Sequence, residues 1–181
     1  MSTINKKLSD EEVVKLEETE LEAVTTLYEE VTRHMQQNGS DQWDRYYPTQ
    51  PLFAADLHNG HLYGIRAEGK WIGVVALNDE QGPEFAGLPW RDGWGRAMVI
   101  HRLAVHPAYQ GHGIGKKLLR FAEAFAVESE YTSIRFDAYT ANEAAIAMYE
   151  KAGYAAVGEI RYPFRKYPFR CYEKLVSELC P

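Results

Sequence analysis

The chain has 181 residues, of which 45% are hydrophobic and 25% charged, and its formal net charge is −6 at pH 7. This composition predicts a folded protein, because disordered chains are much poorer in apolar residues. The length predicts a single domain over residues 1–181. The negative charge argues against a nucleic-acid partner, since such binding depends on cationic side chains.

The sequence also argues against export and membrane insertion. Residues 1–12 lack the apolar core of a signal peptide, and the chain has no apolar run of about 18 residues or more. Cys171 and Cys180 are too few for a disulfide-stapled secreted scaffold. His58 and His61 have no neighbouring carboxylate or cysteine that would complete a metal site. We therefore expect a cytoplasmic protein with neither a membrane partner nor a bound metal.

Two helices are predicted in the first third of the chain. Residues 19–37 carry apolar side chains at helical spacing and are followed by Asn38-Gly39, a typical helix stop. Residues 40–51 are aromatic and broken by prolines, which indicates a loop. A shorter helix is expected over residues 52–60.

A hairpin and a loop follow. Residues 61–69 and 70–78 are rich in β-forming side chains and meet near Glu68-Gly69, which predicts two antiparallel strands joined by a tight turn. Residues 79–95 are expected to form a surface loop.

The second half alternates strands and helices. Residues 97–106 form a continuous apolar run typical of a buried strand, and a long helix is expected to begin near Gly113. Its predicted apolar face carries Ile114, Leu118, Phe121 and Phe125. Residues 133–140 alternate like a strand, and residues 142–153 have helical spacing closed by glycine. Two final β-like runs flank a basic aromatic segment.

The order of these elements predicts the fold class. A strand, a helix and a second strand over residues 97–139 imply a right-handed crossover between parallel strands. The other strands are expected to be hairpins. We therefore predict a mixed α/β domain with a central, mostly antiparallel sheet of about six to seven strands, one parallel pair and helices on both faces.

A glycine-rich turn, residues 110–115, lies between a predicted strand and a helix start. Backbone N–H groups at a helix start lack partners and attract anions, so this turn could hold a phosphate group with Lys116 as a charge partner. A Walker loop is disfavoured by Gln110 and Lys117, and a dinucleotide fingerprint would need glycine at position 116. A tight connection without a ligand is the alternative.

Two motifs carry a family resemblance. The pattern QxxGxG at residues 110–115 resembles the pyrophosphate loop of the GNAT family of N-acetyltransferases, and the pattern NxxAxxxYxxxGY at residues 142–154 resembles that family's later helix and strand. The resemblance covers about residues 97–160. It implies an acetyl-CoA-dependent N-acetyltransferase with the GNAT fold.

The resemblance also implies which residues contact acetyl-CoA. The main chain of Leu103, Ala104 and Val105 would pair with the pantetheine arm, and Asn142 would assist the cofactor. The pyrophosphate would be held at Gln110, Gly111, His112, Gly113, Ile114, Gly115 and Lys116. Leu103 and Val105 could equally belong to the core, and Asn142 could be a helix N-cap.

Catalysis would need a base for the amine and an acid for the leaving thiolate. Tyr149 matches the family's proton donor, and ordinary packing is its alternative. His101 lies where family members often carry a glutamate, so it is the candidate base. A buried histidine bonded within the sheet is the alternative, and Asp137 and Tyr139 are rival bases.

The expected acceptor is a primary amine on a small molecule or a peptide. Trp43, Asp44, Tyr46 and Tyr47 could line an acceptor pocket or pack at the surface. The segment 161–170 could face an acidic acceptor, although a solvated hairpin edge is the favoured interpretation. A non-catalytic module that senses acyl-CoA is the alternative function, and a homodimer is left open.

Overall fold

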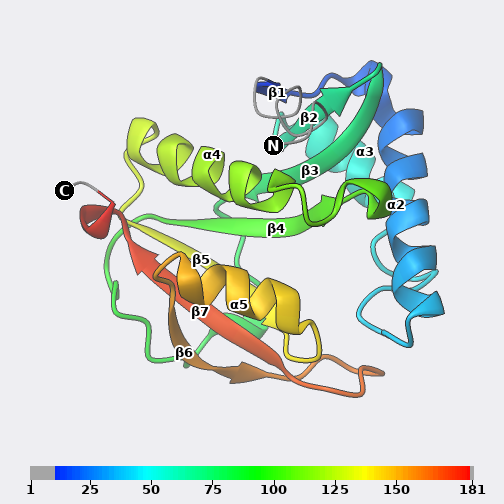
Figure 1. Cartoon of the computed structure of the whole chain (residues 1–181). Coiled ribbons are helices and arrows are strands. Elements are labelled where there is room, and N and C mark those ends of the chain that lie inside the picture. Colours follow the sequence, from blue (N-terminus) through cyan, green and yellow to red (C-terminus); the bar gives the residue numbers. More distant parts are fainter. Residues whose placement is uncertain (1–10, 180–181) are drawn as a thin grey trace. The chain divides into compact units, whose positions relative to one another are not determined.

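The computed structural model describes residues 11–179, in which four α-helices and seven strands occur (Figure 1). The α-helices are α2 (Leu21–Gln37), α3 (Gln50–His58), α4 (Ile114–Glu128) and α5 (Glu143–Lys151). The strands are β1 (Val13–Lys15), β2 (Leu62–Ala67), β3 (Lys70–Asn78), β4 (Ala97–Val105), β5 (Ser133–Tyr139), β6 (Ala155–Ile160) and β7 (Phe169–Leu175).

The strands follow the hydrogen-bonded order β1-β2-β3-β4-β5-β7-β6. β4 and β5 run parallel, with Ala97 opposite Ser133. The pairs β1–β2, β2–β3, β5–β7 and β6–β7 are antiparallel. The predicted mixed sheet with one parallel pair is therefore confirmed.

The described residues form two compact units, each assembled from segments that are distant in sequence. Unit 1 comprises residues 11–77 and 101–121, and unit 2 comprises residues 78–100 and 122–179. The strand β4 and the helix α4 each contribute to both units. The prediction of a single domain stays a prediction.

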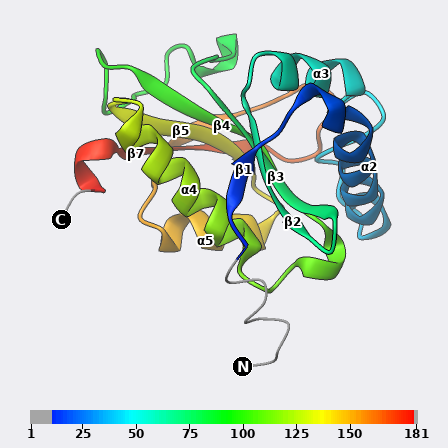
Figure 2. The ribbon, with the colours of Figure 1, turned by 90° about the horizontal axis from the view of Figure 1, so that it is seen from above.

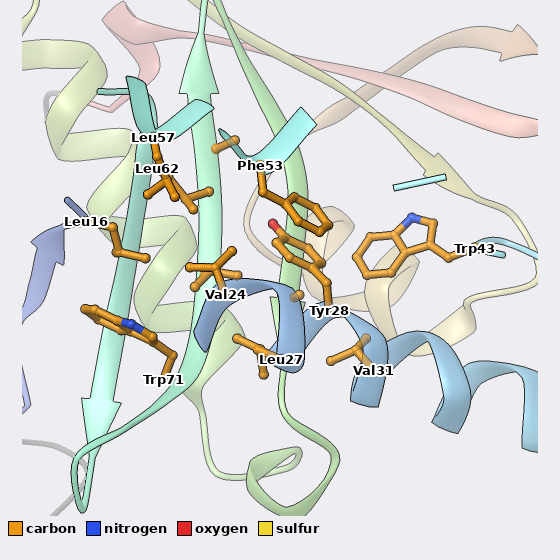
Figure 3. Close-up of a cluster of buried hydrophobic side chains, with 13 residues drawn as sticks. Leu16, Val24, Leu27, Tyr28, Val31, Trp43, Phe53, Leu57, Leu62 and Trp71 are labelled. Carbon is orange, nitrogen blue, oxygen red and sulfur yellow. The ribbon is translucent and has the colours of Figure 1, made fainter. Parts of the chain in front are cut away.

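Unit 1 has its core between α2, α3 and the β2–β3 hairpin. Val24, Leu27 and Val31 repeat at helical spacing along α2 and are buried, because this face packs against the hairpin. Figure 2 shows α2 and α3 side by side. Figure 3 shows the cluster, in which Tyr28 stacks on Phe53 with ring centroids 4.2 Å apart.

The β2–β3 hairpin of unit 1 carries helices on both of its faces. Val74 belongs to the cluster with α2, whereas a Cβ added at the adjacent Gly73 would lie 2.7 Å from Ile114 of α4. Since successive strand residues point to opposite faces, α2 and α4 cover opposite sides. The predicted turn is also confirmed, because Glu68 and Gly69 have φ of 52° and 78°, as a two-residue hairpin turn requires.

Unit 2 is organised by an aromatic cluster between α5 and β5. The Phe136 ring lies 4.3 Å from that of Tyr149 and 4.9 Å from that of Tyr154. Figure 1 shows α5 lying along β5 and β7. A second cluster contains Phe85, Val99, Tyr139, Ile160, Phe169 and Cys171.

Most element boundaries lie within two residues of the sequence predictions, but some features differ. The strand β1 was not predicted. The second helix begins at Gln50 rather than at residue 52. On α4, Ile114 and Leu118 are buried as predicted, but Phe121 and Phe125 are only partly buried. Both phenylalanines instead pack against tyrosines, Tyr63 and Tyr131 respectively.

Candidate functional site

The glycine turn connects β4 to α4. Gly111 and Gly113 have φ of 78° and 84°, a left-handed conformation that glycine adopts without a steric cost. A Cβ built on either residue would meet no atom within 4 Å, and both residues are exposed. The turn is therefore open on the side where a side chain would otherwise project.

The turn is braced against the end of β4. The side-chain amide of Gln110 donates to the Val105 carbonyl at 3.2 Å, and a ring nitrogen of His112 lies 2.9 Å from the Gln110 carbonyl. The backbone N–H of His106 donates to the Ile72 carbonyl of β3 at 2.9 Å. Gln110 thus fixes the turn relative to the strand that precedes it.

The start of α4 has the general features of an anion-binding helix N-terminus. The carbonyl of Gly113 accepts from the N–H of Lys117 at 3.0 Å, so Gly113 stands at the helix N-terminus. The N–H groups of the first helical turn have no partner within a helix, and the helix dipole is positive there. Ile114 is buried, which anchors the helix start, and Lys116 is exposed and can neutralise an anion.

The burial of the β4 residues changes near the middle of the strand. The residues before position 101 are buried, whereas His101 and Leu103 are half-buried. Arg102 is half-buried as a whole residue, but its side chain is buried. Arg102 has a φ of 50°, which is uncommon for a residue with a side chain. Ala104 is buried again and Val105 is half-buried. The candidate base and the candidate pantetheine segment therefore flank a break in the regular pleat.

The break at Arg102 is tied to both N-terminal helices. Its guanidinium group donates to the Asp56 carboxylate of α3 at 2.6 Å, and its main-chain carbonyl accepts from the Tyr28 hydroxyl of α2 at 2.8 Å. Burial raises the pKa of Tyr28, so this hydroxyl remains a donor at neutral pH. Sequence reasoning missed these contacts.

In unit 2, Asn142 caps α5. Its side-chain oxygen accepts from the N–H of Ala145 at 3.2 Å, which confirms the N-cap interpretation. A role toward the cofactor stays a prediction.

Tyr149 lies on the buried side of α5. Its side chain packs against Phe136, Tyr154 and Tyr172. Burial, together with the nearby charge of Asp137, raises the pKa of this phenol. A phenol with a raised pKa stays protonated at neutral pH, which is the state that a proton donor needs.

Asp137 is half-buried in the middle of β5. Burial raises the pKa of its carboxyl to about 6, and the Glu84 charge contributes, while a hydrogen bond with Tyr162 acts in the opposite direction. A carboxylate with this pKa is largely ionised at pH 7 and can accept a proton. Asp137 therefore remains a rival to His101, whereas Tyr139 is only 1% exposed and sits in the apolar cluster.

The aromatic loop is more structural than the sequence suggested. Trp43 is 4% exposed and belongs to the unit 1 core. The Asp44 carboxylate accepts from the N–H groups of Tyr46 and Tyr47 at 2.7 and 3.0 Å, which closes a turn. Tyr46 and Tyr47 are 71% and 41% exposed. These two are the exposed members of the four predicted residues, although Tyr46 contacts Arg45 and Tyr47 hydrogen-bonds with the Arg102 side chain.

Within the described range, residues 11–179, no cluster of three or more histidines, cysteines or carboxylates could hold a metal ion. No helix in that range is long and apolar enough to span a membrane. Unit 1 brings together His101, Leu103–Val105 and the glycine turn. Unit 2 holds Asn142 and Tyr149.

Comparison with known proteins identifies the family. A model described as the Acetyltransferase (GNAT) family matches residues 22–154. The chain belongs to the GNAT family. This GNAT protein is 33% identical over 132 residues to the N-alpha-acetyltransferase RimI of Mycobacterium tuberculosis, covering 70% of each chain. It is 27% identical over 139 residues to the uncharacterized N-acetyltransferase YesJ of Bacillus subtilis, covering 76% of this chain and 77% of the relative.

Solved structures show the same fold. A GNAT acetyltransferase from Streptococcus agalactiae superposes with a TM-score of 0.79 at 20% identity, over 93% of this chain and 96% of its own. The acetyltransferase yncA from Salmonella typhimurium, solved with acetyl-CoA, gives a TM-score of 0.70 at 16% identity, over 92% and 94%. As a GNAT member, the chain is an N-acetyltransferase whose acetyl donor is acetyl-CoA.

Proposed function

We propose that this GNAT enzyme transfers the acetyl group of acetyl-CoA directly to a primary amine of a small molecule or a peptide. The observation that carries the proposal is the glycine turn, which is open, exposed and placed at the start of α4. In this proposal Gln110–Lys116 hold the pyrophosphate and the main chain of Leu103–Val105 pairs with the pantetheine arm. Asn142 assists from the start of α5.

Direct transfer is supported by the state of the one cysteine in residues 11–179. Cys171 is fully buried, and burial raises the pKa of its thiol to about 12. The thiolate is the nucleophilic form of cysteine, so this thiol is poorly suited to carry the acetyl group. The amine itself is therefore the proposed nucleophile.

Bound acetyl-CoA supplies an acetyl group activated as a thioester. A lysine-like amine, with a pKa of about 10.4, must first lose a proton, which we assign to His101 with Asp137 as the rival. The amine nitrogen then bonds to the acetyl carbon, the carbon–sulfur bond breaks, and the nitrogen releases its second proton to solvent, which leaves a neutral amide. Tyr149 donates its phenolic proton to the departing sulfur and is reprotonated from solvent.

The names of similar proteins, and not the geometry of the site, support the proposed class of acceptor. The name of the Mycobacterium relative describes an N-alpha-acetyltransferase, and a solved structure of the same fold is the ribosomal-protein-S18-alanine N-acetyltransferase of Escherichia coli. Peptides with a free α-amino group are therefore the first acceptors to test, followed by small polyamines and amino sugars.

Tyr149→Phe tests the proposed acid. Thiol release from acetyl-CoA is measured with a panel of amines, and kcat is expected to fall by roughly 10²- to 10⁴-fold because a positioned proton donor is lost. Tyr131→Phe is the matched control, since the Tyr131 hydroxyl accepts from Arg96 at 3.2 Å and the residue is 8% exposed, as Tyr149 is. Undiminished turnover in Tyr149→Phe would show that the assigned donor is wrong.

The non-catalytic alternative gives a different result. A module that only senses acyl-CoA would bind acetyl-CoA in a calorimetric titration but release no thiol with any amine, in the parental protein as well as in the variant. That outcome would refute the transfer proposal.

A further inference from the structure

Arg102 is unusual among the described residues with side chains. Four described residues other than glycine have a positive φ. Three of them lie in turns, namely Glu68, Glu130 and Phe164. Arg102, at 50°, is the one that lies inside a strand. A left-handed residue with a side chain is strained, and the strain persists only where the surroundings hold it.

Three buried side chains hold this conformation. Tyr28, Asp56 and Arg102 come from α2, α3 and β4, and we name this cluster the β4 clamp. The Arg102 and Asp56 side chains are 6% and 5% exposed, and Tyr28 is 1% exposed. The Asp56 carboxylate contacts the Arg102 guanidinium group, which also hydrogen-bonds with the more exposed Tyr47. The Tyr28 hydroxyl holds the Arg102 carbonyl, so both the side chain and the main chain are held.

Stability alone does not explain why the β4 clamp contains a buried ion pair. Desolvation of a buried ion pair offsets much of its attraction, and apolar residues of similar volume often stabilise a core as well or better. The Arg102 Nε is also buried with no hydrogen-bond partner among the described residues, which adds a cost. What the clamp does provide is one defined backbone conformation at position 102.

The backbone next to Arg102 is the segment proposed to meet acetyl-CoA. Leu103–Val105 are fixed on their N-terminal side by the clamp. On their C-terminal side, Gln110 donates to the Val105 carbonyl and His106 donates to the Ile72 carbonyl. His101 lies on the other side of Arg102 and is half-buried. The two anchors therefore enclose the candidate pantetheine segment.

We propose that the β4 clamp positions the main chain of Leu103–Val105 for acetyl-CoA binding. Tyr28, Asp56 and Arg102 are positioning residues that act through the backbone and do not touch the reacting atoms. This inference rests on the proposed function, because it presumes that β4 pairs with the pantetheine arm.

Tyr28→Phe is the most selective test. The variant removes the hydroxyl that holds the Arg102 carbonyl but keeps the ring stacked on Phe53. We expect the KM for acetyl-CoA to rise roughly tenfold, at the upper end of the effect of one hydrogen bond. The KM for the amine should stay within about twofold, and amide hydrogen exchange in residues 101–105 should become faster.

Tyr131→Phe serves as the control, since it loses one tyrosine hydroxyl contact in unit 2. Both variants are expected to melt within a few degrees of each other. The proposal is overturned if Tyr28→Phe and Tyr131→Phe have the same KM for acetyl-CoA.

The double variant Asp56→Leu/Arg102→Met distinguishes a positioning role of the β4 clamp from a purely structural role. It removes both charges and keeps apolar volume, so the melting temperature should change little. We expect its KM for acetyl-CoA to rise at least tenfold because the side-chain anchor at position 102 is lost and only the Tyr28 hydroxyl still holds the backbone there. An unchanged KM would contradict the proposal. Failure of the proposed function would look different, because the parental protein would then release no thiol with any amine, whether or not it binds acetyl-CoA.

Discussion

The two units each contain a buried arginine–carboxylate pair, and the two pairs hold different kinds of segment in place. Unit 1 has Arg102 with Asp56, and unit 2 has Arg135 with Glu173 at 3.0 Å. The Glu173 carboxylate also accepts from the N–H of Arg91 at 2.6 Å, and the Arg135 guanidinium donates to Gln81 at 2.8 Å. Unit 2 therefore uses its pair to fasten the loop between β3 and β4.

In unit 1 the buried ion pair holds a strand, β4, instead of a loop. Arg135 has no positive φ and stacks on the Trp90 ring at 4.4 Å, whereas Arg102 is left-handed and leaves its Nε without a partner. A satisfied pair that holds a loop serves the stability of the fold. A strained, incompletely satisfied pair beside the candidate cofactor segment is better explained by the backbone that it positions.

The largest expected effect is on the free energy of unfolding, and it distinguishes a pair that stabilises the fold from a pair that positions the backbone. Glu173→Ala leaves the Arg135 cation and two backbone N–H groups without their partner, so the free energy of unfolding should fall by about 3–5 kcal/mol. Urea denaturation measures this change. Acetyl-CoA affinity of the folded fraction should be unchanged. Glu159→Ala, which removes an exposed contact to Arg170, should cost at most about 1 kcal/mol. Equal losses in the two variants would show that the Glu173 pair is not a structural anchor.

A smaller effect concerns Asp137, which has a tyrosine as its hydrogen-bond partner where Glu173 has an arginine. Its pKa is raised from 3.8 to about 6, so the folded state binds the proton more tightly than the unfolded state does. The stabilising contribution is present below about pH 4 and is lost as the pH rises through 6. Asp137→Asn should remove this dependence and increase stability at pH 7 by about 1–3 kcal/mol.

Melting temperatures of the parental protein and Asp137→Asn between pH 4 and pH 7 measure this difference. Parallel curves would show that Asp137 titrates normally. If kcat also falls in Asp137→Asn but not in His101→Gln, the base is Asp137.

The smallest expected effect asks whether unit 2 contributes to the cofactor. Asn142→Ala removes the cap of α5 and should lower the free energy of unfolding by about 1 kcal/mol. If Asn142 also assists acetyl-CoA, the dissociation constant should rise about threefold or more. Asn142→Asp keeps the capping oxygen and isolates the cofactor effect. An unchanged dissociation constant in both variants would limit Asn142 to capping.

Much of the fold could be predicted from sequence because its signals are local. The apolar spacing of α2 and α4 and the Glu68-Gly69 turn each depend on neighbouring residues. The strand β1 has three residues, of which two are exposed, so it has no such signal. Its pairing is provided by β2.

The site was predictable only where a motif describes it. The glycine turn and Tyr149 belong to recognisable patterns, whereas the clamp joins residues 46 and 74 positions apart in sequence. One signal was available, since Arg102 and Asp56 are charges inside otherwise apolar segments. A charge in a buried strand requires a partner, but the sequence alone could not identify which one.

Calorimetric titration of acetyl-CoA into Gly113→Val and Gly39→Val tests the central claim, that the glycine turn binds the cofactor. Both glycines have a positive φ, 84° and 79°, and an added Cβ would meet no atom within 4 Å at either position, so the backbone strain is matched. The claim predicts parental affinity in Gly39→Val and at least about a hundredfold weaker binding in Gly113→Val, because the side chain occupies the space of the pyrophosphate. Equal affinities in the two variants would contradict it.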